Sequence, residues 1–264
     1  MAYSYPYDKI SFDISEEMMS LIASDDVYHK KHARRYARTF QVLMDQKPKG
    51  RLLELGTSNL TPLVLEKILP DLEVTVTHFD LSQRVEHKYI AELNGKTREV
   101  QAYSVDLEST PLPAEDETFD VVLCCEVLEH MEIDPMFMMS EINRVLKDKG
   151  LLILTTPNVL SSIGITKIMS GVEPYFYMHY NKDRSFYRHN YEYTVLSLSK
   201  LLKSSGFEGS AWTEDTFEDA QMEVPKKLID AGFPIKHLGD NIFTVGKKSG
   251  PVTDRHPSIL YADE

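Results

Sequence analysis

The sequence predicts an α/β fold built on a doubly wound, mostly parallel sheet of seven strands. Short apolar and β-branched runs alternate with segments of helical periodicity, which is the order that parallel βαβ units produce. Some runs, such as Gly150-Leu-Leu-Ile-Leu-Thr155, are almost entirely apolar, as in strands buried between two layers of helices. Acidic residues end three of the runs, at the edge where open α/β sheets bind their ligands.

The first helical region covers residues 15–46 and is interrupted near Ser24-Asp25-Asp26. We therefore expect an N-terminal helical cap (1–48) on a main domain (49–264). Pro70 ends the next helix, and Asn94-Gly95 is a turn signal after a polar segment that we expect to be helical. The expected helices of the main domain are 61–69, 82–93, 135–146 and 194–204, and the expected strands are 51–56, 73–80, 99–105, 118–124, 150–155, 211–213 and 241–245.

Residues 158–193 form an aromatic-rich insertion after the fifth expected strand. Its aromatic residues are Tyr175, Phe176, Tyr177, Tyr180, Phe186, Tyr187, Tyr191 and Tyr193. Because ligands bind at this end of such a sheet, we expect the insertion to be a lid over the bound substrate. An ordinary packed subdomain is the alternative, and the two are compatible.

Composition narrows the possible functions. The net charge of −12 makes the chain a poor general partner for nucleic acid and leaves a small molecule as the expected partner. No run has the length of a membrane span, and the two cysteines, Cys124 and Cys125, are adjacent, which predicts a reducing, cytoplasmic location. The basic segment His29–Arg38 is either a solvated helix face or a site for one anionic group of a small substrate.

Three strand ends carry residues suited to a nucleoside. Glu54 and Gly56 end the first strand, where a glycine permits close approach of a ligand to the backbone. Asp80 ends the second strand and could accept hydrogen bonds from a ribose diol. Asp106 and Leu107 follow the third strand and could address the edge and face of an adenine. Each acid alone could be a helix cap, but three at successive strand ends favour a binding site.

With these residues in order, the chain resembles the class I S-adenosylmethionine-dependent methyltransferases, which have a Rossmann-like fold. The matching segments are Leu52–Gly56, His78–Asp80, Val105–Leu107, Pro111–Pro113, Phe119–Val122, Glu126–His130, Glu141–Leu146, Gly150–Leu154 and Ser204–Phe207. Ser58 and Leu60 replace the family's usual second and third glycines. The missing glycines also argue against a nicotinamide cofactor.

The resemblance implies how S-adenosylmethionine is bound. Gly56 would let the backbone pass the methionine part, Asp80 would hold the ribose hydroxyls, and Cys125 would line the methionine side. The full set of implied cofactor-binding residues is Glu54, Gly56, Thr57, Ser58, Asp80, Leu81, Asp106, Leu107 and Cys125.

Glu126, Glu129 and His130 follow directly after an apolar strand. If that segment is helical, the spacing i, i+3, i+4 puts all three on one face, just beyond the carboxyl end of the strand. His130 is then a candidate general base for a hydroxyl or amine acceptor. Carboxylates and imidazoles also bind divalent metals, so a metal-assisted reaction is a further possibility.

The triplet resembles the Glu-x-x-Glu-His segment of the ubiquinone-pathway O-methyltransferases and of the small-RNA 2′-O-methyltransferases. In the RNA-modifying family a downstream histidine completes a metal site, which nominates His189 as a second catalytic histidine and a fourth ligand. The resemblance thus implies that Glu126, Glu129, His130 and His189 bind Mg, Mn, Fe or Zn. The net charge argues against an RNA acceptor.

The expected activity is methyl transfer from S-adenosylmethionine to a hydroxyl or amine of a small polar acceptor, such as a sugar, a glycan precursor or a natural-product intermediate. Two other functions use the same kind of sheet: a nicotinamide-dependent oxidoreductase and a non-catalytic S-adenosylmethionine-binding protein.

We predict that Asp80→Ala weakens binding of the demethylated cofactor by about 1–3 kcal/mol, because a charged acceptor of the ribose diol is lost. Calorimetry measures this directly. An unchanged affinity in a folded variant would remove Asp80 from the site.

Overall fold

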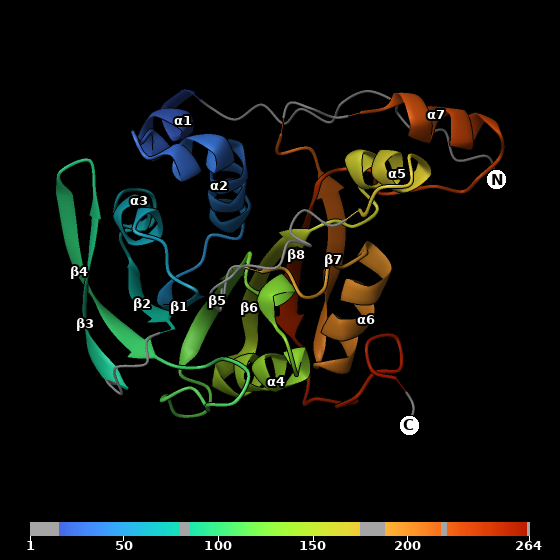
Figure 1. The fold of residues 1–264 in the computed structure, drawn as a ribbon. Coiled ribbons are helices and arrows are strands. Elements are labelled where there is room, and N and C mark those ends of the chain that lie inside the picture. The colour runs from blue at the N-terminus through green and yellow to red at the C-terminus, as the bar shows by residue number, and fades with distance from the viewer. Residues whose placement is uncertain (1–15, 80–84, 175–187, 218–220, 263–264) are drawn as a thin grey trace.

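The computed structural model describes residues 16–79, 85–174, 188–217 and 221–262 (Figure 1). The strands are β1 (Gly50–Leu55), β2 (Leu72–His78), β3 (Glu86–Leu93), β4 (Lys96–Ser104), β5 (Phe119–Cys125), β6 (Leu146–Pro157), β7 (Phe207–Glu214) and β8 (Asn241–Lys248). The helices are α1 (Glu16–Ile22), α2 (Val27–Asp45), α3 (Leu60–Ile68), α4 (Pro135–Val145), α5 (Ser162–Met169), α6 (Val195–Ser204) and α7 (Glu223–Asp230), with one 3₁₀ turn, η1 (Leu128–His130). None of these described helices combines the length and the apolar character that crossing a bilayer requires.

The strands form one mixed sheet in the order β3-β4-β2-β1-β5-β6-β8-β7. The five strands from β4 to β6 in this order are mutually parallel, and β3, β8 and β7 pair antiparallel. The predicted α/β class and parallel centre are confirmed. The predicted count of seven strands was wrong, because the sheet described here has eight.

The additional strand is β3, which replaces the helix predicted over residues 82–93. Asn94 and Gly95 have φ values of +51° and +73°, and Leu93 pairs with Lys96 across them. Positive φ at both central residues is the geometry of the two-residue turn that closes a β-hairpin, and Asn-Gly is its strongest sequence signal. The Asn-Gly turn therefore makes residues 86–93 a strand, although their polar composition is also compatible with a helix.

Apolar side chains of the central strands alternate between two cores. In β1, Leu52 belongs to the core under α1, α2 and α3, whereas Leu53 and Leu55 belong to the core under α4 and α6. All three are fully buried. Figure 1 shows the sheet between these two sets of helices, as the period of two in the strands requires.

The N-terminal helices are part of the first core. Met18 and Ile22 of α1 and Phe40 and Leu43 of α2 pack with residues of β1, β2 and β5. Asp26 begins α2 by accepting a hydrogen bond from the His29 amide at 2.9 Å. The helical cap therefore shares its hydrophobic core with the sheet.

The described part of the insertion contains a helix that the sequence patterns did not predict. α5 begins at Ser162, capped by Ser161, and packs against α7 beyond the carboxyl edge of the sheet (Figure 1). Six of the eight aromatic residues of the insertion fall in 175–187, outside the described residues. The predicted lid is therefore described only in its two flanking parts.

A buried ion pair joins α2 to the far end of β7. Arg38 Nε donates to both carboxylate oxygens of Glu214, at 3.0 and 2.8 Å, and the Glu214 side chain is only 2% exposed. We expect Arg38→Met to lower the free energy of unfolding by about 3 kcal/mol, because Glu214 would remain as a buried, uncompensated charge. Urea denaturation measures this loss.

Two variants control the prediction. Arg38→Met combined with Glu214→Leu should recover most of the stability, because no charge is then left unpaired. Lys30→Met removes another α2 cation, whose ion pair with Asp25 is exposed, and should cost nothing measurable. Equal losses in Arg38→Met and Lys30→Met would contradict the assignment.

Candidate functional site

A cavity of about 400 Å³ lies where β5 and β6 end and is bordered by α2 and α5. Its polar and charged lining residues are Tyr28, Lys31, His32, Arg35, Glu126, Glu129, His130, Asn158, Ser161, Arg188, His189, Glu192, Asp240 and Asn241. These residues come from the cap, from the ends of the strands and from the flanks of the insertion. The cavity thus occupies the position that open α/β sheets use for ligands.

The predicted cofactor loop begins at Gly56, which has a φ of +68°. A Cβ atom there would lie 2.6 Å from Val127 Cγ2, so only glycine fits this position. Thr57 Oγ1 donates to Glu54 Oε2 at 3.2 Å. Burial raises the pKa of Glu54 to about 8, although hydrogen bonds from Thr61 and Thr57 oppose the shift. Glu54 therefore shapes the loop from within the protein.

Asp106 and Leu107 follow the end of β4. Asp106 accepts hydrogen bonds from the Glu108 amide at 3.0 Å and from Ser109 Oγ at 2.7 Å, which is the turn-capping role that the sequence left open. Leu107 packs against the core under α4. Asp80 and Leu81 lie outside the described residues.

Cys125 is the last residue of β5 and pairs with Thr155 of β6. Burial raises the pKa of its thiol to about 12, with a hydrogen bond from Thr155 acting in the opposite direction. The thiol is therefore neutral near pH 7. It can line an apolar ligand surface but is poorly suited to act as a nucleophile.

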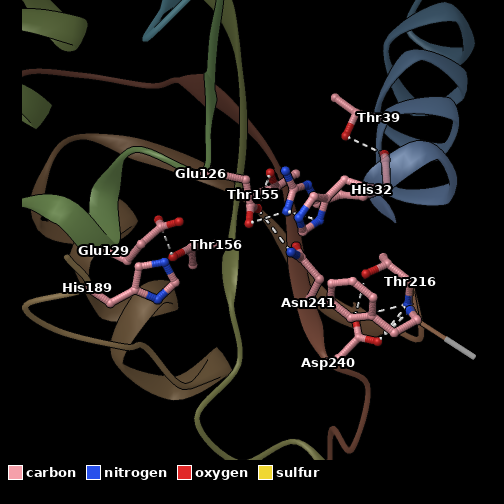
Figure 2. A network of polar contacts seen from close by, with 12 residues as sticks. His32, Thr39, Glu126, Glu129, Thr155, Thr156, His189, Thr216, Asp240 and Asn241 are labelled. Atoms are coloured by element: carbon pink, nitrogen blue, oxygen red, sulfur yellow. Dashed lines mark hydrogen bonds and ion pairs between the residues drawn. The ribbon is translucent and has the colours of Figure 1, made fainter. Parts of the chain in front are cut away.

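Glu126 is held by three elements at once (Figure 2). Its Oε2 accepts from Arg35 Nη1 of α2 at 2.9 Å. Its Oε1 accepts from Thr155 Oγ1 at 2.8 Å and from Asn241 Nδ2 at 3.0 Å. Both carboxylate oxygens are thus occupied by protein donors.

The predicted helical face of Glu126, Glu129 and His130 is wrong. Glu126 has a φ of +56°, and residues 128–130 form a single 3₁₀ turn rather than an α-helix. The left-handed residue reverses the chain, so the Glu126 carboxylate bonds Arg35. Glu129 instead lies near His189 (Figure 2). Of the four predicted metal ligands, Glu126 is therefore separated from the other three.

Glu129, His130 and His189 do come together. One ligand-capable atom from each lies within 4.8 Å of the others, and the two imidazole rings meet edge to face with centroids 5.0 Å apart. His130 Nδ1 donates to the Arg188 carbonyl at 3.0 Å, and His189 Nδ1 donates to Glu192 Oε1 at 3.0 Å. These contacts place a proton on Nδ1 of each ring.

Burial sets the protonation of this group. Glu129 is fully buried, and burial, followed by the charge of Glu126, raises its pKa well above the usual range. Its Oε2 accepts from Thr156 Oγ1 at 2.9 Å, whereas its Oε1 has no hydrogen-bond partner among the described residues. Burial lowers the pKa of His130, so this imidazole is neutral near pH 7.

Several cavity residues were missed by the sequence patterns. His32 and Arg35 belong to the basic segment predicted as a solvated face or an anion site, but both are buried, and Arg35 is paired with Glu126. Burial lowers the pKa of His32 to about 4, and its Nδ1 accepts from Arg35 Nη1 at 3.1 Å. No local sequence motif marks Asp240 and Asn241 as cavity residues. They line the cavity because β8 starts there in the folded sheet.

Asp240 organises one wall of the cavity. Its carboxylate accepts from the Thr216 amide and hydroxyl and from the Phe217 amide, at 2.6 to 2.9 Å. Burial raises its pKa to about 6. The Phe217 ring is thereby held against His32, with a centroid distance of 5.4 Å.

Comparisons with known proteins agree with this fold. The family model for the methyltransferase domain matches residues 28–211, most of the chain. A SAM-dependent methyltransferase of Thermotoga maritima, described as a possible histamine N-methyltransferase, is 21% identical, with a TM-score of 0.51 over 84% of this chain and 93% of that protein. A SAM-dependent methyltransferase of Archaeoglobus fulgidus is 16% identical, with a TM-score of 0.53 over 84% of this chain and all of that protein.

One curated relative matches a short segment. An uncharacterized protein of Methanocaldococcus jannaschii is 49% identical over 47 residues, which are 18% of this chain and 20% of that protein. The match thus spans about a fifth of the relative's length and carries no functional assignment. The family match rests on residues 28–211, and at these identities the solved structures establish the fold. The chain belongs to the methyltransferase-domain family, and its fold is that of the class I S-adenosylmethionine-dependent methyltransferases.

Proposed function

We propose that this chain transfers a methyl group from S-adenosylmethionine to a hydroxyl or amine of a small polar acceptor bound in the cavity. The observation that carries the proposal is that the cavity begins at Glu126, directly after Cys125, the residue that the family resemblance assigns to the methionine side. A cavity of about 400 Å³ suits a small molecule rather than a polymer. The family match favours methyl transfer over a nicotinamide-dependent reaction.

The bound sulfonium supplies an activated methyl group: the acceptor lone pair forms the new bond to carbon while the carbon–sulfur bond breaks. The protein then has to orient the acceptor, exclude water and remove one proton. We propose that His130 Nε2 takes that proton, since the ring is neutral and its Nδ1 is fixed on Arg188. His189, fixed on Glu192, would hold the acceptor on the same side.

Asn241 is proposed to recognise the acceptor. Its side chain lines the cavity, and the residue is 3% exposed. Donation from Nδ2 to Glu126 fixes the orientation of the amide, and Oδ1 has no hydrogen-bond partner among the residues that the structure describes. An unpaired buried acceptor is costly, so the preferred substrate should present an O–H or N–H here, beside the group that is methylated.

Two segments are proposed to close the site over a main domain of residues 49–264. α2 of the cap (1–48) and the described flanks of the insertion (158–193) both supply cavity-lining residues. Closure of this kind would keep water from the sulfonium and favour transfer to the acceptor.

The donor set also fits a divalent cation. Glu129 offers Oε1, which accepts no hydrogen bond from the described residues and lies 4.0 Å from His130 Nε2. Both histidines donate Nδ1–H to an oxygen, as metal-bound imidazoles usually do. We propose that Glu129, His130 and His189 would hold the ion, without Glu126. A set with two imidazoles suits Zn, Fe or Mn better than Mg. A bound cation would lower the pKa of an acceptor hydroxyl.

We predict that the chain moves labelled methyl from S-adenosylmethionine to at least one member of a panel of sugars, phenols and amines, and that Asn241→Leu raises the KM for that acceptor about tenfold. Affinity for the demethylated cofactor should not change. Thr155→Val, which removes the other bond to Glu126 Oε1, should leave the KM near that of the wild type.

The outcomes separate the alternatives. Cofactor binding without transfer to any panel member would favour a non-catalytic binding protein. A KM increase of the same size in Thr155→Val would show that Asn241 acts only by supporting Glu126.

The metal proposal predicts one divalent ion per chain by elemental analysis. Metal affinity should fall at least tenfold in Glu129→Gln and in His189→Gln, because each removes a ligand. Glu126→Gln should retain the ion, which distinguishes this site from the four-ligand set predicted from the sequence. His256→Gln, in the C-terminal tail, is the matched control. Full activity in chelator with no bound metal would leave His130 as a simple base.

A further inference from the structure

The cofactor loop of this chain contains a single glycine. After Gly56 come Thr57, Ser58, Asn59 and Leu60, so the backbone freedom that further glycines would provide is absent. The amides of Gly56 and Thr57 are tied to Thr77 Oγ1 and O at 3.1 and 2.8 Å. The second half of the loop must be positioned by other contacts.

Asn59 makes one of these contacts in an unusual way. It occupies the N-cap position of α3, yet its side chain makes no capping hydrogen bond. An asparagine at this position normally accepts a bond from an amide of the first helical turn. Here Ser58 Oγ accepts from the Thr61 amide instead, at 3.2 Å. The Asn59 side chain is therefore available for another partner.

That partner is the additional strand β3. The Tyr89 hydroxyl donates to Asn59 Oδ1 at 2.5 Å, and the Glu92 amide approaches the same oxygen at 3.4 Å. Tyr89 packs against the core under α3 and lies beside the His78 ring, with a centroid distance of 5.7 Å. Burial, and after it the nearby charge of Glu54, raises the pKa of Tyr89, so the hydroxyl remains a donor.

Two further bonds fix the hairpin that carries Tyr89. Arg98 Nη1 donates to the Pro62 carbonyl in the first turn of α3 at 2.6 Å. Asn94 Nδ2, at the tip, donates to the Ala23 carbonyl between α1 and α2 at 2.6 Å. Figure 1 shows the β3–β4 hairpin beside α3 with its tip near α1. The hairpin thus connects the cap, α3 and the cofactor loop.

We propose that Tyr89 is a positioning residue for the cofactor: through Asn59 it holds loop 56–60 in the shape that accepts the methionine part of S-adenosylmethionine. In this way the β3–β4 hairpin fixes the conformation of a loop that lacks further glycines. Tyr89 acts on the loop through its hydrogen bond to Asn59. The inference rests on S-adenosylmethionine binding, and it is independent of the acceptor and of any metal.

Calorimetry with S-adenosylhomocysteine and with adenosine tests the proposal on the full chain. Tyr89→Phe and Asn59→Ala should each weaken S-adenosylhomocysteine about fivefold, the worth of one neutral hydrogen bond. The double variant should lose no more than Asn59→Ala alone, because that change already removes the Tyr89 bond. Adenosine lacks the methionine part, so its affinity should stay within about twofold in every variant.

Tyr261→Phe is the matched control. Its hydroxyl bonds Asp134 and the Met136 amide at the start of α4, on the opposite face of the sheet. This variant should lower the melting temperature and leave S-adenosylhomocysteine affinity unchanged.

Three results would overturn the inference: unchanged S-adenosylhomocysteine affinity in both single variants, an equal loss for adenosine, or additive losses in the double variant. A wild-type chain that binds no S-adenosylhomocysteine would instead refute the cofactor assignment from which the inference starts.

Discussion

The ion pair between Glu126 and Arg35 is the interaction on which the site depends. The Glu126 side chain is 12% exposed and that of Arg35 is 8% exposed, so both charges are largely removed from water. Such a pair offsets its desolvation only when hydrogen bonds satisfy the remaining oxygens. Thr155 and Asn241 provide them, and in doing so they link β5, β6, β8 and α2 at one point. The left-handed backbone at Glu126, which costs free energy by itself, is tolerated because these contacts determine it.

This arrangement divides the cavity into two chemically different halves. On one side, Glu126 orients Asn241, whose Oδ1 remains as an acceptor for a substrate donor. On the other side, Glu129, His130 and His189 form a group in which both imidazoles have fixed Nδ1 protons. The first half can recognise an acceptor and the second can remove its proton or hold a cation. Cys125, which the family resemblance assigns to the methionine side, directly precedes Glu126 in the chain.

The predicted cofactor loop is likewise held by hydrogen bonds from side chains. Only Gly56 meets a steric requirement for glycine, and the rest of the loop is held by side chains. Glu54 accepts a hydrogen bond from Thr57, and Ser58 accepts one from the Thr61 amide in the first turn of α3. The hydroxyl of Tyr89, on β3, donates to Asn59. The contact with β3 joins this loop to a residue 30 positions away in sequence, because Tyr89 bonds Asn59.

Local sequence was sufficient for most of the architecture and for part of the site. The period of two in β1, the glycine at Gly56 and the clustering of Glu129 and His130 after β5 all follow from residues close together in the chain, because backbone conformation and side-chain direction are local properties. Even the hairpin at Asn94-Gly95 carried a local signal. Only the tertiary structure decided which charges are paired: Arg35 and Glu126 are 91 residues apart, and Asn241 a further 115 beyond Glu126. Long polar side chains take the partner that the fold brings within reach, and burial then makes that partner obligatory.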